Sequence, residues 1–348
     1  MPDVWFAIPG DLAALTGGYA YARRLIAALP SAGWIPRHLR LPAEFPKPSA
    51  STLSATRSIL SAVPAGAIVL VDGLAFSALP REMLADFDLG FVALVHHPLA
   101  AETGLSESEV EQFKDCERAA LAAARAVVVT SRHTRETLVR EYGVARGKLC
   151  LAPPGTDQAA RARGSGPTAK LLTVATLTHR KAHDVLIAAL ARLADLAWSC
   201  DLVGSLDRDP RITANVRALI KASGLEARVR LLGELQDSAL DAAYAGSDIF
   251  VLPSRHEGYG MVFAEALARG LPIVACAAGA VTETVPAAAS VLVPVDNPAA
   301  LSEALRRLLT DPIYRKQLSD AAWDHGRGLP TWSDTAAQVG QALIRSSQ

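Results

Sequence analysis

The chain has 348 residues, of which half are apolar and a fifth are charged, and its 35 basic and 35 acidic side chains give a formal net charge of zero. This length exceeds one ordinary hydrophobic core and predicts two domains, while the apolar content argues against wholesale disorder. The balanced charge, without interleaved basic and aromatic residues, argues against a nucleic-acid-binding protein.

The sequence shows no signal for secretion, membrane insertion or metal binding. The amino-terminal residues lack a basic flank and a long apolar core, and no apolar run approaches the roughly 18 residues of a spanning helix. We therefore expect a cytoplasmic protein. Cys116, Cys150, Cys200 and Cys276 lie far apart, without histidines at ligand spacing. This spacing predicts buried, reduced thiols, with no disulfide framework and no metal site.

The first half of the chain alternates β-rich apolar runs with helical segments. A capping box, formed by Ser106 and Glu109, marks the start of one helix. Together these patterns predict strands at 4–8, 67–71, 91–95 and 126–129, and helices at 19–29, 107–123 and 132–141.

The second half repeats this alternation after a Gly-, Ser- and Pro-rich stretch at 161–167, which is typical of an interdomain linker. Apolar strands separated by helices imply parallel sheets covered on both faces. We expect an α/β protein with two tandem Rossmann-like doubly wound domains and a ligand site in the cleft between them. The expected strands are 170–175, 199–203, 229–232, 249–252 and 272–275, and the expected domains are 1–163 and 164–330, with a terminal helix in 331–348 that could pack back on the first domain.

Two glutamates, Glu257 and Glu265, stand eight positions apart around a glycine turn. Gly258 and Gly260 permit the turn, and helical periodicity over 261–268 follows it. The helix start offers backbone N–H groups to an anion, while Glu265 could accept hydrogen bonds from ribose hydroxyls. The pattern favours a sugar-nucleotide site. The alternative is an ordinary strand–loop–helix unit with solvated glutamates.

Three other polar clusters follow predicted strands. Gly17 and Gly18 permit close approach of the backbone to a phosphate, although a turn without a ligand is the alternative. A histidine pair, His96–His97, follows the strand at 91–95 and fits a site better than a lone histidine would. Arg180 and Lys181 precede a helix and could neutralise a diphosphate as it leaves.

Taken together, these residues resemble the retaining glycosyltransferases of family four, also described as glycosyl transferases group 1, which have the GT-B architecture. The resemblance covers nearly the whole chain, and its most specific part is the Glu-x7-Glu segment. The motifs that carry it are Gly17-Gly18, Ser131-Arg132-His133-Thr134, Pro154-Gly155-Thr156-Asp157, Arg180-Lys181 and Glu257-x7-Glu265 with Gly-Tyr-Gly.

The resemblance implies a first domain for the acceptor and a second domain for the nucleotide-sugar donor. It further implies that Lys181, with Arg180, binds the donor diphosphate and that Glu257 contacts the donor sugar. The histidine near the reacting sugar matches His97, although His96 could take that position. Donor binding is assigned to Gly17, Gly18, Gly258, Tyr259, Gly260, Met261, Val262 and Glu265, of which Glu265 holds the ribose.

The resemblance also implies an activity, namely metal-independent transfer of a hexosyl group from a UDP- or GDP-sugar to an acceptor hydroxyl, with retention of configuration. No cofactor is expected besides the nucleotide sugar, which is a co-substrate. The acceptor could be a saccharide, a small molecule or a lipid; four arginines at 23, 24, 37 and 40 could meet an anionic membrane, but are more typical of a solvated surface.

Two other functions stay open, one because of a departure from the family and one because an epimerase uses the same paired-Rossmann plan. Many members have Gly-Arg where this chain has Ala175-Thr176, so one cationic contact with the diphosphate is missing unless Arg180 replaces it. A protein that binds sugar nucleotides without transferring them is one alternative. A non-hydrolysing sugar-nucleotide epimerase is another, but it would need further acid–base carboxylates.

Overall fold

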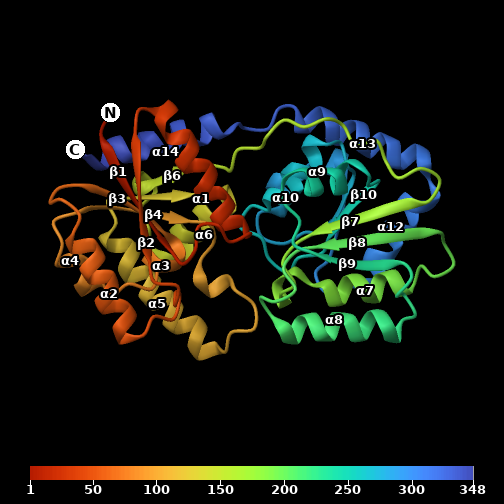
Figure 1. Cartoon of the computed structure of the whole chain (residues 1–348), viewed down its shortest axis with the longest axis horizontal. Coiled ribbons are helices and arrows are strands. Elements are labelled where there is room, and N and C mark those ends of the chain that lie inside the picture. The colour runs from red at the N-terminus through yellow and green to blue at the C-terminus, as the bar shows by residue number, and fades with distance from the viewer. Residues whose placement is uncertain (348) are drawn as a thin grey trace. The chain divides into compact units, whose positions relative to one another are not determined.

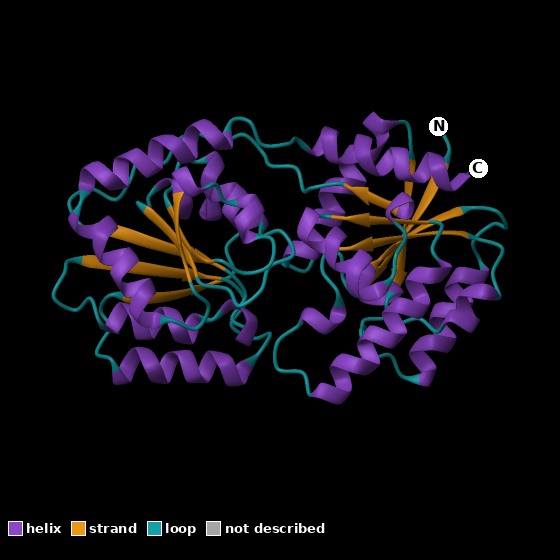
Figure 2. Ribbon diagram, turned by 180° about the vertical axis from the view of Figure 1, so that it is seen from behind, coloured by secondary structure: helices purple, strands orange, loops and turns teal. Residues whose placement is uncertain are grey.

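The computed structural model describes residues 1–347, which form two α/β units (Figure 1). The first unit comprises Met1–Gly155 together with the segment that begins at Pro330, and the second comprises Thr156–Leu329. Within the described residues, each unit has a six-stranded sheet in which every paired strand is parallel. Helices cover both faces of each sheet (Figure 2). The prediction of two doubly wound domains is confirmed.

The sheet of the first unit has the strand order β2-β1-β3-β4-β5-β6. Every residue of β3, β4 and β5 is buried, because helices lie on both sides of these central strands. The strands are β1 (Asp3–Pro9), β2 (Ile35–Leu41), β3 (Ile68–Asp72), β4 (Gly90–Val95), β5 (Ala126–Val129) and β6 (Leu149–Leu151). The α-helices are α1 (Gly17–Ala28), α2 (Ala50–Ser61), α3 (Gly73–Phe76), α4 (Arg81–Ala85), α5 (Glu107–Ala123), α6 (Arg132–Tyr142) and α14 (Trp332–Ser347), with 3₁₀ turns η1 (Leu29–Ala32), η2 (Leu99–Ala101) and η3 (Arg146–Lys148).

The sheet of the second unit has the order β12-β11-β10-β7-β8-β9. Its strands are β7 (Ala169–Val174), β8 (Trp198–Val203), β9 (Val229–Gly233), β10 (Ile249–Leu252), β11 (Ile273–Cys276) and β12 (Ser290–Val293). Its α-helices are α7 (His183–Ala191), α8 (Pro210–Ala222), α9 (Asp237–Ala245), α10 (Met261–Ala268), α11 (Val281–Thr284), α12 (Pro298–Thr310) and α13 (Pro312–Gly326), with 3₁₀ turns η4 (His179–Lys181) and η5 (Ala287–Ala289).

Successive residues of β7 show how the second sheet is covered. Leu171 belongs to a hydrophobic cluster with residues of α7, α8 and α12, whereas the next residue, Leu172, packs with residues of α9, α10 and α13. Side chains alternate across a strand, so burial of both neighbours requires a helical layer on each face. The continuous apolar runs of the sequence follow from this arrangement.

The chain passes between the units at Gly155–Thr156 and again at Leu329–Pro330. Residues 156–163, expected at the end of the first domain, group with the second unit, because the Ala162 and Arg163 N–H groups donate to the carbonyls of Arg269 and Ala245. Helix α14 groups with the first unit.

Several local features differ from the predictions or extend them. Strands β2, β6 and β12 were not predicted. Cys116 is exposed, which corrects the expectation that all four thiols are buried; the other three are buried.

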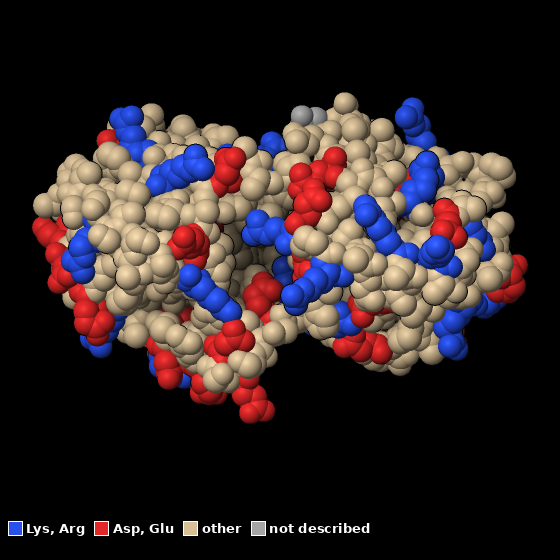
Figure 3. Space-filling view, turned by 60° about the horizontal axis from the view of Figure 1, so that its bottom comes forward, with Lys and Arg blue, Asp and Glu red and all other residues tan. Residues whose placement is uncertain are grey.

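Within residues 1–347, no helix has the length and apolar character needed to cross a bilayer. On the face shown in Figure 3, acidic and basic side chains are interspersed, in line with the zero net charge.

Candidate functional site

The loops that carry the predicted residues of the second unit lie side by side at the point where its strand order reverses. From β7 the chain continues to β8 and β9 on one side, and it returns to place β10 on the other side. The carboxyl ends of β7 and β10 are therefore adjacent, and such a reversal is the usual ligand site of an open α/β sheet. The loop after β7 carries Arg180 and Lys181, and the loop after β10 carries Glu257.

The structure brings these three side chains together. The Lys181 ammonium donates to Glu257 Oε1 at 2.6 Å, and Arg180 Nη1 lies 3.3 Å from Oε2. Arg180 also donates to the His256 carbonyl at 2.9 Å, and the Ser254 hydroxyl donates to Glu257 Oε1 at 2.6 Å. Glu257 is only 4% exposed, so it is not the solvated glutamate of the alternative interpretation.

Electrostatics keep the buried Glu257 ionised. Burial by itself would raise the pKa of this carboxyl, but Lys181 and Arg180 outweigh burial and hold the pKa at about 2. The two cations and one carboxylate leave a single positive charge in excess next to Glu257. This excess suits an anionic ligand.

Arg255, which the sequence analysis missed, fastens the two loops to each other. Its backbone N–H donates to the Arg180 carbonyl at 2.8 Å. Its guanidinium binds the Asp184 carboxylate at 2.8 and 3.2 Å, the Asp296 carboxylate at 2.7 Å, and the His179 carbonyl. The only sequence signal was its place inside the Glu257 motif, because the Asp partners are distant along the chain.

Two backbone conformations bring the loops close. Ala182, which ends η4 and precedes α7, has a φ of 54°, in the left-handed region that costs a non-glycine residue roughly 1–2 kcal/mol. Gly279 has a φ of 58°, and a Cβ atom there would lie 2.2 Å from the Glu257 carbonyl oxygen. Glycine at 279 therefore permits the approach of the neighbouring turn to Glu257.

Glu265 lies inside α10, as predicted, and is oriented by a buried tyrosine. The Tyr244 hydroxyl donates to Glu265 Oε2 at 2.8 Å. Burial and the nearby Glu265 raise the Tyr244 pKa well above its ordinary value, so the phenol remains a donor. Arg269 lies 4.6 Å from the Tyr244 ring centroid and donates to the Glu265 carbonyl. The hydrogen bond from Tyr244 thus fixes one oxygen of the Glu265 carboxylate.

The residues that precede the predicted anion-binding helices do not cap them. The N-cap residues of α1, α7, α9 and α10 make no side-chain hydrogen bond to their helices. Within the first turn of α7, the Asp184 carboxylate does accept from the backbone N–H groups of Asp184 and Val185. Gly260, in the left-handed conformation, precedes α10 and places Gly258, Tyr259, Met261 and Val262 around its start. Other long helices are capped by Ser49, Ser106, Ser131, Asp209, Asn297 and Asp311, among which the predicted Ser106–Glu109 capping box is confirmed. Uncapped first turns leave N–H groups that an anion can satisfy.

The first unit also places its predicted residues at a reversal of strand order, between β1 and β3. A Cβ atom on Gly18 would lie 3.8 Å from the His96 ring, which packs edge-on against Tyr21. His96 Nε2 lies 3.6 Å from Asp72 Oδ2 and makes no hydrogen bond within the described part of the chain. His97 instead bonds to Glu102 at 2.7 Å. The geometry thus places His96, rather than His97, beside the Gly17–Gly18 loop.

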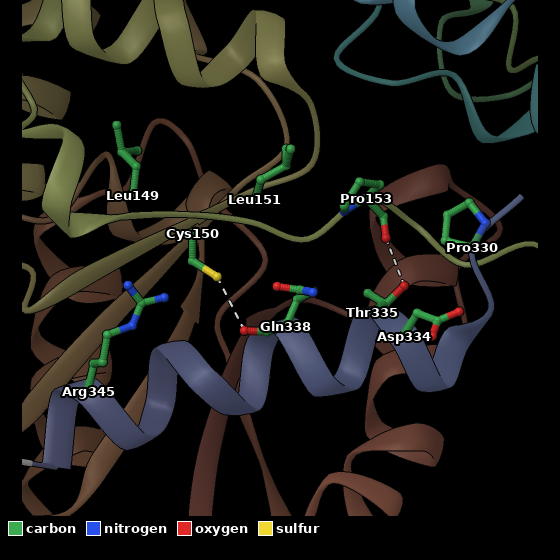
Figure 4. A pocket seen from close by; sticks show the side chains of 9 residues that line it. All are labelled: Leu149, Cys150, Leu151, Pro153, Pro330, Asp334, Thr335, Gln338 and Arg345. Carbon is green, nitrogen blue, oxygen red and sulfur yellow. Dashed lines mark hydrogen bonds between the residues drawn. The ribbon is translucent and has the colours of Figure 1, made fainter.

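A separate hollow of about 420 Å³ lies where α14 runs beside β6 in the first unit (Figure 4). The Cys150 thiol donates to the Gln338 carbonyl, and the Thr335 hydroxyl donates to the Pro153 carbonyl. These bonds hold the helix to the edge strand.

Within residues 1–347, no cluster of three or more His, Cys, Asp or Glu side chains could hold a metal ion.

Comparison with known families accounts for this combination of loops. Residues 16–160 match the model described as Glycosyltransferase Family 4, and residues 157–325 match the model described as Glycosyl transferases group 1. The chain belongs to this glycosyltransferase family. The second match includes the two loops that carry Glu257, Arg180 and Lys181.

A curated relative agrees with the assignment, and solved structures share the fold. The chain is 28% identical to D-inositol 3-phosphate glycosyltransferase of Corynebacterium glutamicum (strain R), over 72% of this chain and 66% of that relative. It thus spans slightly less than two thirds of that relative's length. Sucrose-phosphate synthase from Thermosynechococcus elongatus has a TM-score of 0.81 at 24% identity, covering 98% of this chain and 97% of that one. Anabaena HepE in complex with UDP-glucose has a TM-score of 0.76 at 15% identity, covering 98% and 99%. The chain has the GT-B fold.

Proposed function

We propose that this glycosyltransferase moves a hexosyl group from a nucleotide-diphosphate sugar to an acceptor hydroxyl, with retention of configuration and without a metal ion. The observation that carries the proposal is the pairing of Arg180 and Lys181 with buried Glu257 at the strand reversal of the second unit. The solved structure of HepE with UDP-glucose supports a UDP-sugar as the first donor to test.

The cations have a defined task in this reaction. When the bond from the sugar to the phosphate breaks, negative charge accumulates on the leaving diphosphate. Lys181, Arg180 and the N–H groups at the start of α10 would stabilise that charge, and one such donor is typically worth roughly 100- to 1000-fold in rate. A lysine has three N–H groups, enough to bind Glu257 and a phosphate oxygen. The two side chains would supply the charge that a divalent metal supplies in other enzymes.

The contacts of Glu257 argue for a binding role. Its carboxylate accepts hydrogen bonds from Lys181, Arg180 and Ser254, and its pKa of about 2 makes it a weak nucleophile. We therefore assign it to the hydroxyls of the donor sugar. Retention would then proceed by a same-face route, in which the leaving phosphate helps to deprotonate the acceptor.

The remaining predicted residues have roles that follow from their positions. Glu265, held by Tyr244, would accept hydrogen bonds from the ribose hydroxyls. In the first unit, the Gly17–Gly18 loop would approach the donor phosphate, and the histidine pair would lie near the reacting sugar. The acceptor is a hydroxyl compound, and D-inositol 3-phosphate belongs in the test set because the relatives carry its name.

A thermal-shift experiment tests donor binding. UDP, GDP, ADP and their sugar conjugates are added to the purified protein, since a ligand at 100 times its Kd stabilises by about 2.7 kcal/mol. We expect one nucleotide to raise Tm selectively, and Lys181→Met to abolish the shift. The surface variant Lys316→Met, whose side chain is 73% exposed, serves as the control. A folded protein that no nucleotide stabilises would contradict the proposal.

Transfer itself requires a second measurement. The selected sugar nucleotide is incubated with a panel of hydroxyl acceptors, and the anomeric configuration of the product is read by NMR. We expect a retained configuration and no loss of rate with EDTA. Donor binding without transfer to any acceptor would favour the sugar-nucleotide-binding alternative that Thr176 suggests.

A further inference from the structure

Glu117 is a buried carboxyl group that the proposed reaction does not use. It lies in the middle of α5 and is 0% exposed. An acidic side chain is seldom fully buried, and its burial is costly unless hydrogen bonds compensate. The position of Glu117 therefore requires a structural explanation.

Hydrogen bonds connect Glu117 to three other elements of the first unit. The hydroxyl of Ser77, the residue that ends α3, donates to Oε1 at 2.6 Å. The backbone N–H of Leu99, in η2, donates to Oε2 at 3.1 Å. The Tyr142 hydroxyl, at the end of α6, also hydrogen-bonds to the carboxyl. One side chain thus joins α3, α5, α6 and η2.

The contact with Leu99 is important because of the sequence that precedes it. Residues 96–101, which we call the histidine loop, read His96-His97-Pro98-Leu99 before two alanines. Pro98 has no N–H group, so the Leu99 N–H is the first backbone donor after the two histidines. The carboxyl of Glu117 holds the loop at this donor.

We propose that Glu117 is a positioning residue of the histidine loop: it fixes the loop at Leu99, while the Thr130 and Thr134 hydroxyls, which donate to the His96 carbonyl, hold its other end beside the Gly17–Gly18 loop. The consequence for catalysis rests on the proposed function, in which the histidine pair contributes to sugar transfer. The structural part stands on the contacts of Ser77, Leu99 and Tyr142 alone.

The strength of the hydrogen bond by which Glu117 holds the histidine loop should depend on pH. Burial raises the pKa of Glu117 to about 7, while the bonds from Ser77, Leu99 and Tyr142 favour the carboxylate. Besides Glu117, two charged groups lie near Tyr142: the Glu141 carboxylate, and Arg118, which binds Asp115 and the Glu141 carbonyl. The Leu99 N–H can only donate, so it binds the carboxylate more strongly than the neutral acid. The loop is therefore held more firmly above pH 7 than below it.

Hydrogen exchange of the full chain tests the positioning role. Mass spectrometry follows peptides that cover the histidine loop at pH 6 and pH 8, corrected for intrinsic exchange. We expect protection of the loop to increase about five-fold from pH 6 to pH 8 in the wild type, which corresponds to the stronger hydrogen bond of a charged acceptor. Glu117→Gln should lose the change, whereas Glu111→Gln, an exposed site on the same helix, should keep it.

Two outcomes would overturn the proposal: loop protection that is independent of pH in the wild type, or a Glu117→Gln variant that retains the wild-type change. Ser77→Ala provides a second variant, because loss of its bond should move the transition to higher pH. In a transfer assay, Glu117→Gln should flatten the kcat/KM profile near pH 7. The exchange experiment decides the positioning role, and absence of transfer by the wild type would refute the proposed function separately.

Discussion

His183 is a buried histidine directly beside the cationic loop. It begins α7, is 1% exposed, and neither ring nitrogen has a hydrogen-bond partner within residues 1–347. Burial, with a smaller effect of Lys181, lowers its pKa from 6.5 to about 4. The imidazole is therefore neutral at physiological pH and adds no charge to the Arg180–Lys181 pair.

This histidine should make the protein sensitive to acid. Between pH 6.5 and about 4 the unfolded chain binds a proton at position 183 and the folded chain does not, so stability falls as the pH falls through this window. The loss is on the order of 3 kcal/mol. His183→Leu should abolish that part of the pH dependence in urea unfolding, and the exposed His325→Gln should leave it unchanged. An unchanged slope in His183→Leu would refute this assignment.

At the residue scale, the sequence predicted the side chains that belong to one motif and missed those that act across motifs. Glu257, Arg180 and Lys181 could be found because their residue types and strand-end positions indicate anion binding. Arg255 could not, because its role depends on Asp184 and Asp296, which only the folded chain brings near. The choice between His96 and His97 also depended on packing, here against Gly18.

Among the elements, the turn before α11 controls the position of the Glu257 loop. The Ala280 N–H donates to the Glu257 carbonyl at 2.8 Å, and Gly279 passes beside the same carbonyl. A side chain at 279 would need a left-handed backbone and would also collide with that oxygen.

Two glycine substitutions separate these effects. Gly279→Ala should destabilise the protein by more than about 2 kcal/mol, because backbone strain and the collision with the Glu257 carbonyl add together. Gly224→Ala is the matched control, since its φ is +64° but no atom lies within 4 Å of the added Cβ; it should cost only about 1 kcal/mol. Equal losses in urea denaturation would show that the close approach is unimportant.

The predicted and the missed elements differ in where they lie in the sheets. Strands β4, β5 and β10 are buried along their whole length and were predicted from their apolar runs. The missed strands β2, β6 and β12 all lie at sheet edges. Strand β2 carries exposed Arg37, His38 and Arg40, so residues on both of its faces meet solvent and its sequence lacks the apolar signal. Edge strands are recognised by their pairing, which the sequence does not show.

At the scale of the whole molecule, the first unit consists of two separate stretches of chain. Its last helix, α14, buries Ala336, Val339, Ala342 and Leu343 against that unit. Contacts with β3, β4, β5 and β6 place α14 across one face of the sheet (Figure 1). The residues of α14 are thus part of a core to which β1, near the amino terminus, also belongs.

Neighbouring residues of α14 allow a test. Leu343→Ala removes a fully buried side chain and should cost about 2–5 kcal/mol, whereas Ile344→Ala, at a 53% exposed position, should change stability by no more than about 0.5 kcal/mol. In calorimetry, the stability lost in Leu343→Ala should lower the unfolding temperature of the first unit only. A shift of the second unit's transition would show that α14 supports both.

The two doubly wound domains could be predicted because each repeats the same alternation of apolar strands and helices. The division at residue 155 was harder to predict, because the Gly-, Ser- and Pro-rich stretch at 161–167 is more conspicuous than Pro154-Gly155. Residues of that stretch hydrogen-bond within the second unit, as Ser165 does with Asp248. Composition signals a loop but does not show which core the loop belongs to.

The return of the chain to the first unit has a consequence for biosynthesis. A ribosome that has released Leu329 has delivered every residue of the second unit, whereas the first unit still lacks α14. The amino-terminal part, made first, therefore exposes the apolar residues of β3, β4, β5 and β6 that α14 covers, and the second unit is the first to be complete. Nascent chains arrested before α14 emerges should accordingly recruit chaperones to the earlier half of the protein.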